Sequence, residues 1–404
     1  MSETSRRGSN AKKKMPTAKL LFRVHSLLGL AAGLALLLVG TSGALLVFSE
    51  ALYHVLFHEL HTVVARGERR GYDELFEAAR QRNPDAYSVR VRRFASAPDE
   101  SVEILIGRSD RGEAVWEREY VDPYTGALLG ERHTGARAGS SNPFGVVLAL
   151  HANLLLGKPG RAVLAVLSLL MLSSVVTGAL VYRRSIAQVL AFRVRLRRGN
   201  ARAVSSTAHR VVGVWSIAFN VVMALTGFWM ARAALSPAYH RPAPAGVQPA
   251  LTFSIDALLE EAQARAPQFV PRRMSHVGGS GEARLSGTQR GQAAWFSDHS
   301  SHVVFDARTG ELERVALIGE APLADKLEAS VKPLHFGIFG GLWTQAAYTL
   351  AGLSLPLLSA TGLIVWWRRR RGPRARRLPA AETAVTALRP APLSVARAQG
   401  DRRR

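Results

Sequence analysis

Four long apolar stretches dominate the pattern of hydrophobic and polar positions along the chain. They cover approximately residues 24–48, 163–182, 211–234 and 342–367, and charged segments separate them. A helix that crosses a bilayer needs about 20 apolar residues, and each stretch has about that length or more. Apolar residues gathered in this way do not indicate one soluble core. The pattern therefore predicts an α-helical membrane protein with four transmembrane helices.

Two long polar segments between these stretches have the patterns of small α+β modules. The first has a helical start, YDELFEAARQRNP, then the strand-like runs SVRVRRF and VEILIG, and a turn at Thr125-Gly126. The second has a helix, DALLEEAQARAP, followed by strands and a turn at Thr309-Gly310. Glycine after threonine suits a hairpin position that needs a positive φ. We expect both segments to fold outside the bilayer.

The formal charge of +23 is concentrated beside the apolar stretches, at residues 6–14, 183–202 and 368–377. Lysine and arginine collect in cytoplasmic loops, so these clusters predict an inner-membrane protein with both termini in the cytoplasm. The two modules then face the periplasm. Flanking of membrane helices accounts for most of the excess charge, and we expect no nucleic-acid partner.

The predicted organisation follows from these features. In chain order it has a basic cytoplasmic N-terminus (1–17), helix 1 (18–50), module 1 (51–143), an outer histidine segment with helix 2 (144–183), a basic cytoplasmic loop (184–205), helix 3 (206–234), module 2 (235–333), an outer histidine segment with helix 4 (334–367) and a basic, disordered cytoplasmic tail (368–404). No small-residue cleavage site follows the first apolar stretch, so we expect an uncleaved first helix.

An internal repeat with an offset of 184 residues relates the two halves of the chain. His25 and Gly29 match His209 and Gly213, and Leu150-His151 matches Leu334-His335. The pairs Thr177-Gly178 and Thr361-Gly362, and the turns at Asp122 and Asp306, keep the same offset. The repeat predicts a tandem duplication of the unit helix, α+β module, helix.

The repeat selects four of the twelve histidines, His25 with His209 and His151 with His335. The topology places the first pair at the cytoplasmic face and the second at the outer face. Two imidazoles from neighbouring helices can hold one haem in an apolar site, and Gly29 and Gly213, at i+4 from their histidines, would leave room for the ring. Two haems would then form an electron path across the bilayer. Two alternatives remain open: interfacial histidines that fix helix ends, and structural histidines copied by the duplication.

Other metal chemistry has less support in the sequence. The absence of cysteine excludes disulfides, thiolate-held iron–sulfur clusters and covalently attached haem. Two histidines per face, with no matching carboxylate, make a poor zinc site. His54, His58 and His61 share one face of a predicted helix, which indicates either an accessory outer metal or docking site or, as we prefer, an amphipathic surface helix. The Thr-Gly pairs near the helix ends are interpreted as helix-packing positions.

The outer histidines are not expected to lie on the membrane helices themselves. His151 precedes Arg183 by 32 residues, and one continuous helix of that length would measure about 48 Å, against a hydrocarbon core of about 30 Å. The GKPG sequence at 157–160 is predicted to break the helix, because proline suits a first helical turn. Short helices at the membrane surface would then carry His151 and His335.

In these motifs, the chain resembles the PepSY-associated transmembrane family of bacterial inner-membrane proteins. The resemblance rests on VHSLLG, AHRVVG, LHANLLLG, the four Thr/Ser-Gly helix ends and the two D-x-x-T-G turns, and it covers approximately residues 18–370. It implies an iron-regulated protein and, for some members, a ferric-siderophore reductase with two b-type haems. By motif, the axial ligands would be His25, His209, His151 and His335.

The leading hypothesis is therefore a membrane oxidoreductase. A cytoplasmic or quinol donor would supply electrons, and a ferric siderophore or another ferric chelate, held between the two modules in the periplasm, would accept them. One alternative is a haem-free scaffold or sensor whose modules bind a ligand or regulate a protease. A siderophore permease is disfavoured, because the four spans contain no broken-helix pair and no buried acidic residue.

Overall fold

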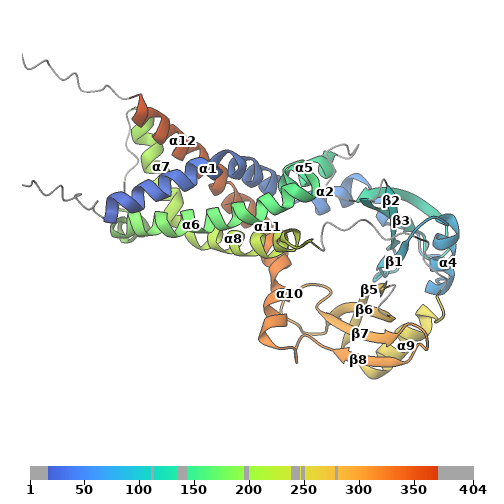
Figure 1. Cartoon of the computed structure of the whole chain (residues 1–404). Coiled ribbons are helices and arrows are strands. Elements are labelled where there is room, and N and C mark those ends of the chain that lie inside the picture. Colours follow the sequence, from blue (N-terminus) through green and yellow to red (C-terminus); the bar gives the residue numbers. More distant parts are fainter. Residues whose placement is uncertain are drawn as a thin grey trace, which may run out of the picture.

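A helical bundle and two small antiparallel sheets make up the protein (Figure 1). The computed structural model describes residues 17–110, 113–134, 143–194, 200–237, 246, 251–277 and 281–371. The predicted cytoplasmic N-terminus and nearly all of the tail lie outside these residues. One end of the bundle, where α1 begins and α12 ends, is here called the terminal end, and the opposite end, next to the sheets, is called the sheet end.

The bundle contains four helical segments that are long and apolar enough to cross a membrane, as the sequence predicted. Leucine side chains such as Leu27 and Leu34 remain 66% exposed, as expected of side chains that face lipid. The helix α1 packs against α6 and α12, while α6 packs against α8. The bounds of the long segments are Thr17–Leu46 (α1), Gly157–Leu190 (α6), Ile217–Ala231 (α8, continued by the 3-10 helix η1, Arg232–Leu235), Gly341–Gly352 (α11) and Ser354–Arg370 (α12).

The third and fourth apolar stretches differ from their predictions as uninterrupted helices. In the fourth, α11 ends at Gly352 and α12 begins at Ser354. In the third, the helix α7, Ala201–Trp215, ends at Ser216, and α8 begins at Ile217. The Ser216 hydroxyl donates to the carbonyl of Val212 at 2.8 Å and accepts from the Asn220 side chain at 2.9 Å. Back-bonding by a serine hydroxyl bends helices, and Ser216 departs from helical geometry with φ at −95° and ψ at 3°.

Short helices carry the chain across the sheet end of the bundle. They are Ser49–Leu56 (α2), His58–His61 (α3), Pro143–Asn153 (α5) and Leu323–Phe336 (α10). A new helix, α6, begins at Gly157 after Leu154 and Leu155 adopt positive φ angles of 54° and 62°. The predicted break at the GKPG sequence is therefore present, and His151 and His335 lie on the short helices α5 and α10.

Each α+β module contains one longer helix and a four-stranded antiparallel sheet whose strands follow chain order. The glycines of the two predicted turns, Gly126 and Gly310, have φ angles of 73° and 77°. The carboxylates of Asp122 and Asp306 accept backbone hydrogen bonds inside these turns. The first module has Tyr72–Arg82 (α4), Ser88–Arg93 (β1), Val102–Asp110 (β2), Glu113–Val121 (β3) and Leu128–Thr134 (β4), and the second has Ile255–Arg265 (α9), Phe269–Val277 (β5), Glu282–Gln289 (β6), Ser301–Asp306 (β7) and Leu312–Ala316 (β8).

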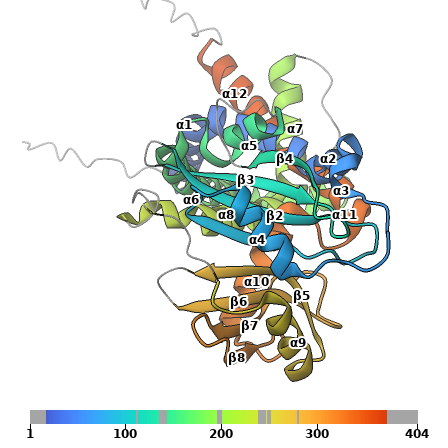
Figure 2. The same ribbon diagram turned by 90° about the vertical axis from the view of Figure 1, so that its right-hand side faces the viewer.

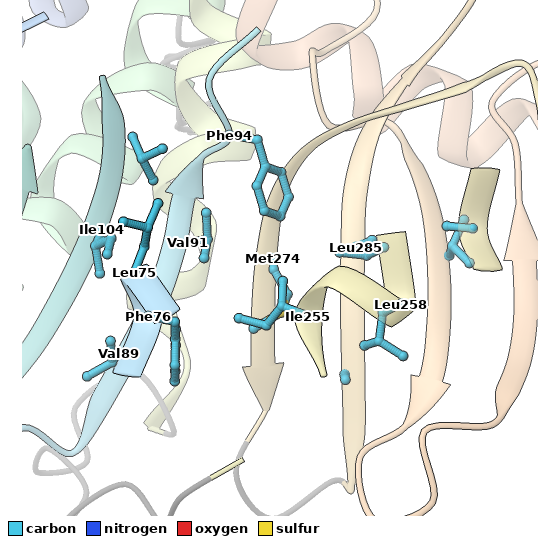
Figure 3. Packing of buried hydrophobic residues seen from close by; sticks show 14 of the residues in the cluster. Leu75, Phe76, Val89, Val91, Phe94, Ile104, Ile255, Leu258, Met274 and Leu285 are labelled. Carbon is cyan, nitrogen blue, oxygen red and sulfur yellow. The ribbon is translucent and has the colours of Figure 1, made fainter. Parts of the chain in front are cut away.

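The two modules share a single hydrophobic core. Figure 2 shows the strands β1–β4 on one side of this region and β5–β8 on the other. Side chains of both modules belong to one buried cluster, in which Val91 and Phe94 lie close to Met274 and Ile255 (Figure 3). The edge strands also meet, since the amide of Phe94 donates to the carbonyl of Arg272 at 2.9 Å. Apolar side chains thus fill the interface in which the sequence analysis expected a ferric chelate.

Two aspartates complete the junction by capping each other's helices. The Asp256 carboxylate accepts from the amides of Tyr72 and Asp73 at the start of α4, at 2.9 and 3.1 Å. The Asp73 carboxylate accepts from the amide of Ile255, at the start of α9, at 2.6 Å. Asp256 therefore supplies the cap that α4 lacks, while Asp73 adds an acceptor at the start of α9, whose own N-cap is Ser254.

Candidate cofactor-binding site

The structure brings both predicted histidine pairs together. His25 of α1 faces His209 of α7 at the terminal end, with ring centroids 6.1 Å apart and ring planes at 72°. His151 of α5 faces His335 of α10 at the sheet end, also at 6.1 Å, with ring planes at 52°. Each pair takes one histidine from each half of the chain. The helix α7 and the helices α5 and α10, which carry members of the two pairs, lie at opposite ends of the bundle (Figure 1).

In the terminal pair, the Nδ1 atom of each ring bonds to a backbone carbonyl of the neighbouring membrane helix. His25 Nδ1 donates to the Ser174 carbonyl at 3.0 Å. His209 Nδ1 donates to the Leu358 carbonyl at 3.1 Å. Ser174 and Leu358 are themselves 184 positions apart, so the two halves make the same contact. With the proton on Nδ1, the lone pair of Nε2 remains as the position that can bind a metal.

The sheet-end pair has the same protonation pattern. His151 Nδ1 donates to the Val39 carbonyl at 2.9 Å. The Nδ1 atom of His335 lies 2.9 Å from the Thr226 hydroxyl, which donates its own proton to the Val222 carbonyl at 2.6 Å. Because the hydroxyl proton is already used, its oxygen accepts from His335 Nδ1. All four imidazoles are thus fixed in one tautomer.

Four glycines that follow a threonine or serine let the imidazoles lie directly against a helix backbone. A Cβ atom added at Gly43 would lie 2.7 Å from His151 Cε1, and one at Gly178 would lie 3.0 Å from His25 Cε1. In the other half, a Cβ at Gly227 would lie 3.6 Å from His335 Cε1, and one at Gly362 would lie 3.4 Å from His209 Cε1. Their interpretation as packing positions alone was too narrow, because these residues position the histidines. The common offset of 184 residues was the signal that could have identified them.

The predicted glycines Gly29 and Gly213 have a different position. They line a cavity of about 460 Å³ that also contains both terminal histidines and is here called the bundle cavity. A Cβ at Gly29 would meet no atom within 4 Å, and one at Gly213 would meet a side-chain atom of Leu358 at 3.5 Å. Their small size therefore keeps the cavity open and does not clear space for the imidazoles.

Three arginines give the otherwise largely apolar bundle cavity a basic rim. Arg23 lies two positions before His25, Arg210 directly follows His209, and Arg369 comes from the end of α12. Within the described residues, the buried Nε atom of Arg210 has no hydrogen-bond partner. A buried guanidinium nitrogen normally requires an acceptor, and an anionic group in the cavity would supply one.

The donor set fits a planar metal cofactor better than a bare ion. A metal–imidazole bond is about 2 Å long, so one metal between two imidazoles requires ring centroids roughly 6 Å apart. Both pairs meet this spacing at 6.1 Å. Among the described residues, no group of three or more His, Cys, Asp or Glu side chains could hold a metal ion. Two imidazoles alone suit a cofactor that supplies the remaining ligands itself, as haem does.

The structure corrects the predicted common face of His54, His58 and His61. The helix breaks at Phe57, where φ is −126° and ψ is 45°, so the three residues lie on two short helices. His54 and His61 stack with ring centroids 3.8 Å apart, while His58 is exposed. His61 is buried, and within the described residues its Nε2 atom has no hydrogen-bond partner. The accessory site is thus reduced to two stacked imidazoles.

Comparisons with known proteins agree with this architecture. The model of a family described as the PepSY-associated TM region matches residues 22–369. An uncharacterized protein of Pseudomonas aeruginosa is 28% identical over 259 residues. That alignment covers 56% of this chain and 63% of the relative, so the chain spans less than two thirds of the relative's length.

Proposed function

Because the chain belongs to the PepSY-associated transmembrane family, we propose that it is a di-haem electron-transfer protein of the bacterial inner membrane. The observation that carries the proposal is the matched geometry of the two histidine pairs, each with ring centroids 6.1 Å apart. Contacts repeated at an offset of 184 residues further support an origin by tandem duplication. The proposal extends the family assignment to a cofactor and a reaction.

Each pair would hold one b-type haem through its two Nε2 atoms. A haem iron held by two imidazoles exchanges single electrons and keeps no coordination position open for substrate. Backbone carbonyls and the Thr226 hydroxyl keep the imidazoles in the ligating tautomer. The largely apolar lining of the bundle cavity suits a porphyrin ring, and Arg23, Arg210 and Arg369 would meet the haem carboxylates.

The distribution of basic residues supports an orientation with both termini in the cytoplasm. In the sequence, the cluster at 6–14 precedes α1, and the described members of the other two clusters, Arg183, Arg184, Arg193, Arg202 and Arg368–Arg371, belong to or adjoin the terminal ends of α6, α7 and α12. Because lysine and arginine collect on the cytoplasmic side, the sheets would face the periplasm. The terminal histidine pair would then lie near the electron donor, and the sheet-end pair near the acceptor.

The proposed reaction is the reduction of a ferric chelate, such as a ferric siderophore, in iron acquisition. A cytoplasmic reductant or a membrane quinol would supply the electrons; a quinol that becomes a quinone releases two electrons and two protons, enough for two ferric ions. Each ferric ion gains one electron. The ferrous product is held less tightly by hard oxygen ligands, which would release the iron.

The first test is the haem content of the detergent-purified protein. We expect a reduced-minus-oxidised absorbance spectrum of b-type haem, and a pyridine haemochrome assay that gives nearly two haems per chain. His25→Ala and His335→Ala should each lower the value toward one, while the exposed His58→Ala should leave it unchanged. Protein without haem from haem-replete cells would overturn the proposal and favour the haem-free scaffold or sensor.

A second test concerns the reaction itself. In membranes supplied with a reductant, His335→Ala should abolish ferric-chelate reduction, because the path to the sheet end is interrupted. Haem at the terminal pair should persist, and its spectrum serves as the control for folding. Unchanged reduction in a variant shown to lack the second haem would exclude this path.

A further inference from the structure

A second cavity lies between the second sheet and the sheet end of the bundle, and we call it the sheet-side cavity. It has a volume of about 690 Å³, within the range of sites for small molecules. Figure 1 shows α10 running from the bundle towards β7 and β8 along this region. The lining comes from both parts of the protein and includes Arg161 of α6, Arg232 after α8, His299 and His302 at β7, and Lys332 of α10.

On the wall formed by β7 and α10, Lys332 of α10 and His302 of β7 line the cavity and have arginines of the neighbouring strands close behind them. The lining as a whole contains three basic side chains, Arg161, Arg232 and Lys332, and three carboxylates. Burial, followed by the positive charges of Arg273 and Arg92, lowers the pKa of Lys332. Burial, followed by the positive charges of Arg284 and Arg273, lowers the pKa of His302 to about 4. Cations held this close together repel one another, so an anion in the cavity would be attracted to all of them.

The carboxylates that line the cavity form no ion pair with Lys332 within the described residues. Glu320, Asp325 and Glu328 are exposed side chains, and Glu328 lies 3.9 Å from Arg232. Asp298, next to the wall, is bonded to His299 at 2.6 Å and also offsets part of the positive charge of Lys332, Arg92 and Arg273. Within the described residues, no carboxylate lies within ion-pair distance of Lys332. Lys332 therefore remains available for a ligand.

The cavity is adjacent to the sheet-end histidine pair through α10. Lys332 and His335 are three residues apart on this helix, so their side chains are neighbours on its surface. The amide of Ser297 donates to the Ala329 carbonyl at 2.9 Å, which ties the loop before β7 to the same helix. A ligand held by Lys332 would thus lie beside the imidazole of His335.

We propose that the sheet-side cavity binds a soluble anionic metal chelate, whose carboxylate groups are held by Lys332 and His302 and attracted by the arginines behind them. The role of this chelate as electron acceptor rests on the proposed function, whereas its binding does not. Carboxylates suit this wall because lysine offers a charged donor and a neutral histidine offers one further N–H group. The cavity thus selects its ligand by negative charge.

The test is calorimetric titration of the full chain in phosphatidylcholine nanodiscs with gallium(III) citrate, an anionic complex of an ion that haem does not reduce. We expect saturable binding, weakened about tenfold in Lys332→Gln, the loss typical of one hydrogen bond to a charged group. The matched control is Lys326→Gln on the same helix, since Lys326 donates to the Gly319 carbonyl and does not line the cavity. Cationic gallium(III) desferrioxamine B should bind more weakly than the citrate complex.

Several outcomes would overturn this inference. They are absence of citrate binding to the wild-type chain, equal affinity of Lys332→Gln and the wild type, and equal affinity for the cationic chelate. Loss of citrate binding in phosphatidylglycerol nanodiscs would assign the cavity to lipid headgroups instead. Haem content is measured on the same samples, so failure of the di-haem proposal is seen separately from failure of chelate binding.

Discussion

The hydroxyl of Thr226 fixes the tautomer of His335, and its removal should weaken the sheet-end site alone. In Thr226→Val the Nδ1 proton loses its acceptor at 2.9 Å. The loss of such a supporting hydrogen bond typically reduces metal affinity 10–100-fold. We expect faster transfer of one haem to an excess of apomyoglobin, while the other haem is retained.

The control for this variant is Thr41→Val, because Thr41 is exposed and its hydroxyl bonds only within its own helix, to the Leu37 carbonyl. This variant should release haem at the wild-type rate. If both variants behaved alike, Thr226 would have no specific role in ligation.

His61 predicts a dependence of stability on pH. Burial and the neighbouring His54 lower the pKa of His61 to about 4. An unfolded histidine titrates near pH 6.5. Between pH 6.5 and 4 the unfolded chain therefore binds more protons than the folded one, and stability falls as the pH decreases through this window.

The measurement is the thermal midpoint of the detergent-solubilised protein at pH 7 and at pH 4.5. His61→Phe keeps an aromatic ring against Tyr120 but removes the titrating group. Its midpoint should decrease less on acidification than that of the wild type, whereas the exposed His58→Phe should follow the wild type. An equal acid shift in all three proteins would exclude His61 as the cause.

The sequence identified the paired histidines but not their surroundings. The common offset separated His25, His151, His209 and His335 from the other eight of the twelve histidines. Contacts such as that of Thr226 with His335 were not predictable, because they depend on how one helix is rotated against another. The stacking of His54 on His61 was missed for a related reason: it requires a helix break at Phe57, where no glycine or proline marks it.

The reciprocal caps of α4 and α9 give a prediction for these helices. Asp256→Ala leaves the first amides of α4 without their acceptors, and such a loss costs about 1 kcal/mol. Although the substitution is in the second module, hydrogen exchange should accelerate at the start of α4 in the first. Asp99→Ala, an exposed aspartate of the first module, is the control. If hydrogen exchange accelerated only in α9, Asp256 would not be the cap of α4.

Helices and strands were predicted well where the hydrophobic pattern was long or a turn residue was diagnostic. The four apolar stretches and the turns at Gly126 and Gly310 belong to this class. The break at Ser216 was not predicted, because the surrounding residues are apolar and helical in pattern. At the break, Ser216 accepts a hydrogen bond from Asn220, a buried residue that also lines the bundle cavity.

The two halves of the protein depend on one another at the histidine pairs, in the core of the modules and at the helix caps. Every histidine pair and both caps use one residue from each half. The sequence repeat predicted two similar units. It could not reveal that the halves share these sites, because a repeat shows which residues correspond and not which residues are in contact. The shared core was likewise invisible in the pattern of each module taken alone.

This dependence can be tested with divided chains. Residues 1–197 and 198–404 expressed separately should each be degraded and bind no haem, since each half has one imidazole of either pair. Coexpression should restore the assembled protein and nearly two haems per pair of fragments, measured by pyridine haemochrome. A first half that is stable and binds haem alone would show that the halves are independent.

The exchange of Asp73 and Asp256 has a consequence for the order of events during biosynthesis. The two residues are 183 positions apart, and at about 5–20 residues per second the ribosome adds the second roughly 10–40 s after the first. During this interval α4 lacks its cap and half of the core around it is absent. Until the second module has been synthesised, the first module therefore stays incompletely folded, with apolar side chains accessible. A segment in this state is a natural substrate for chaperones.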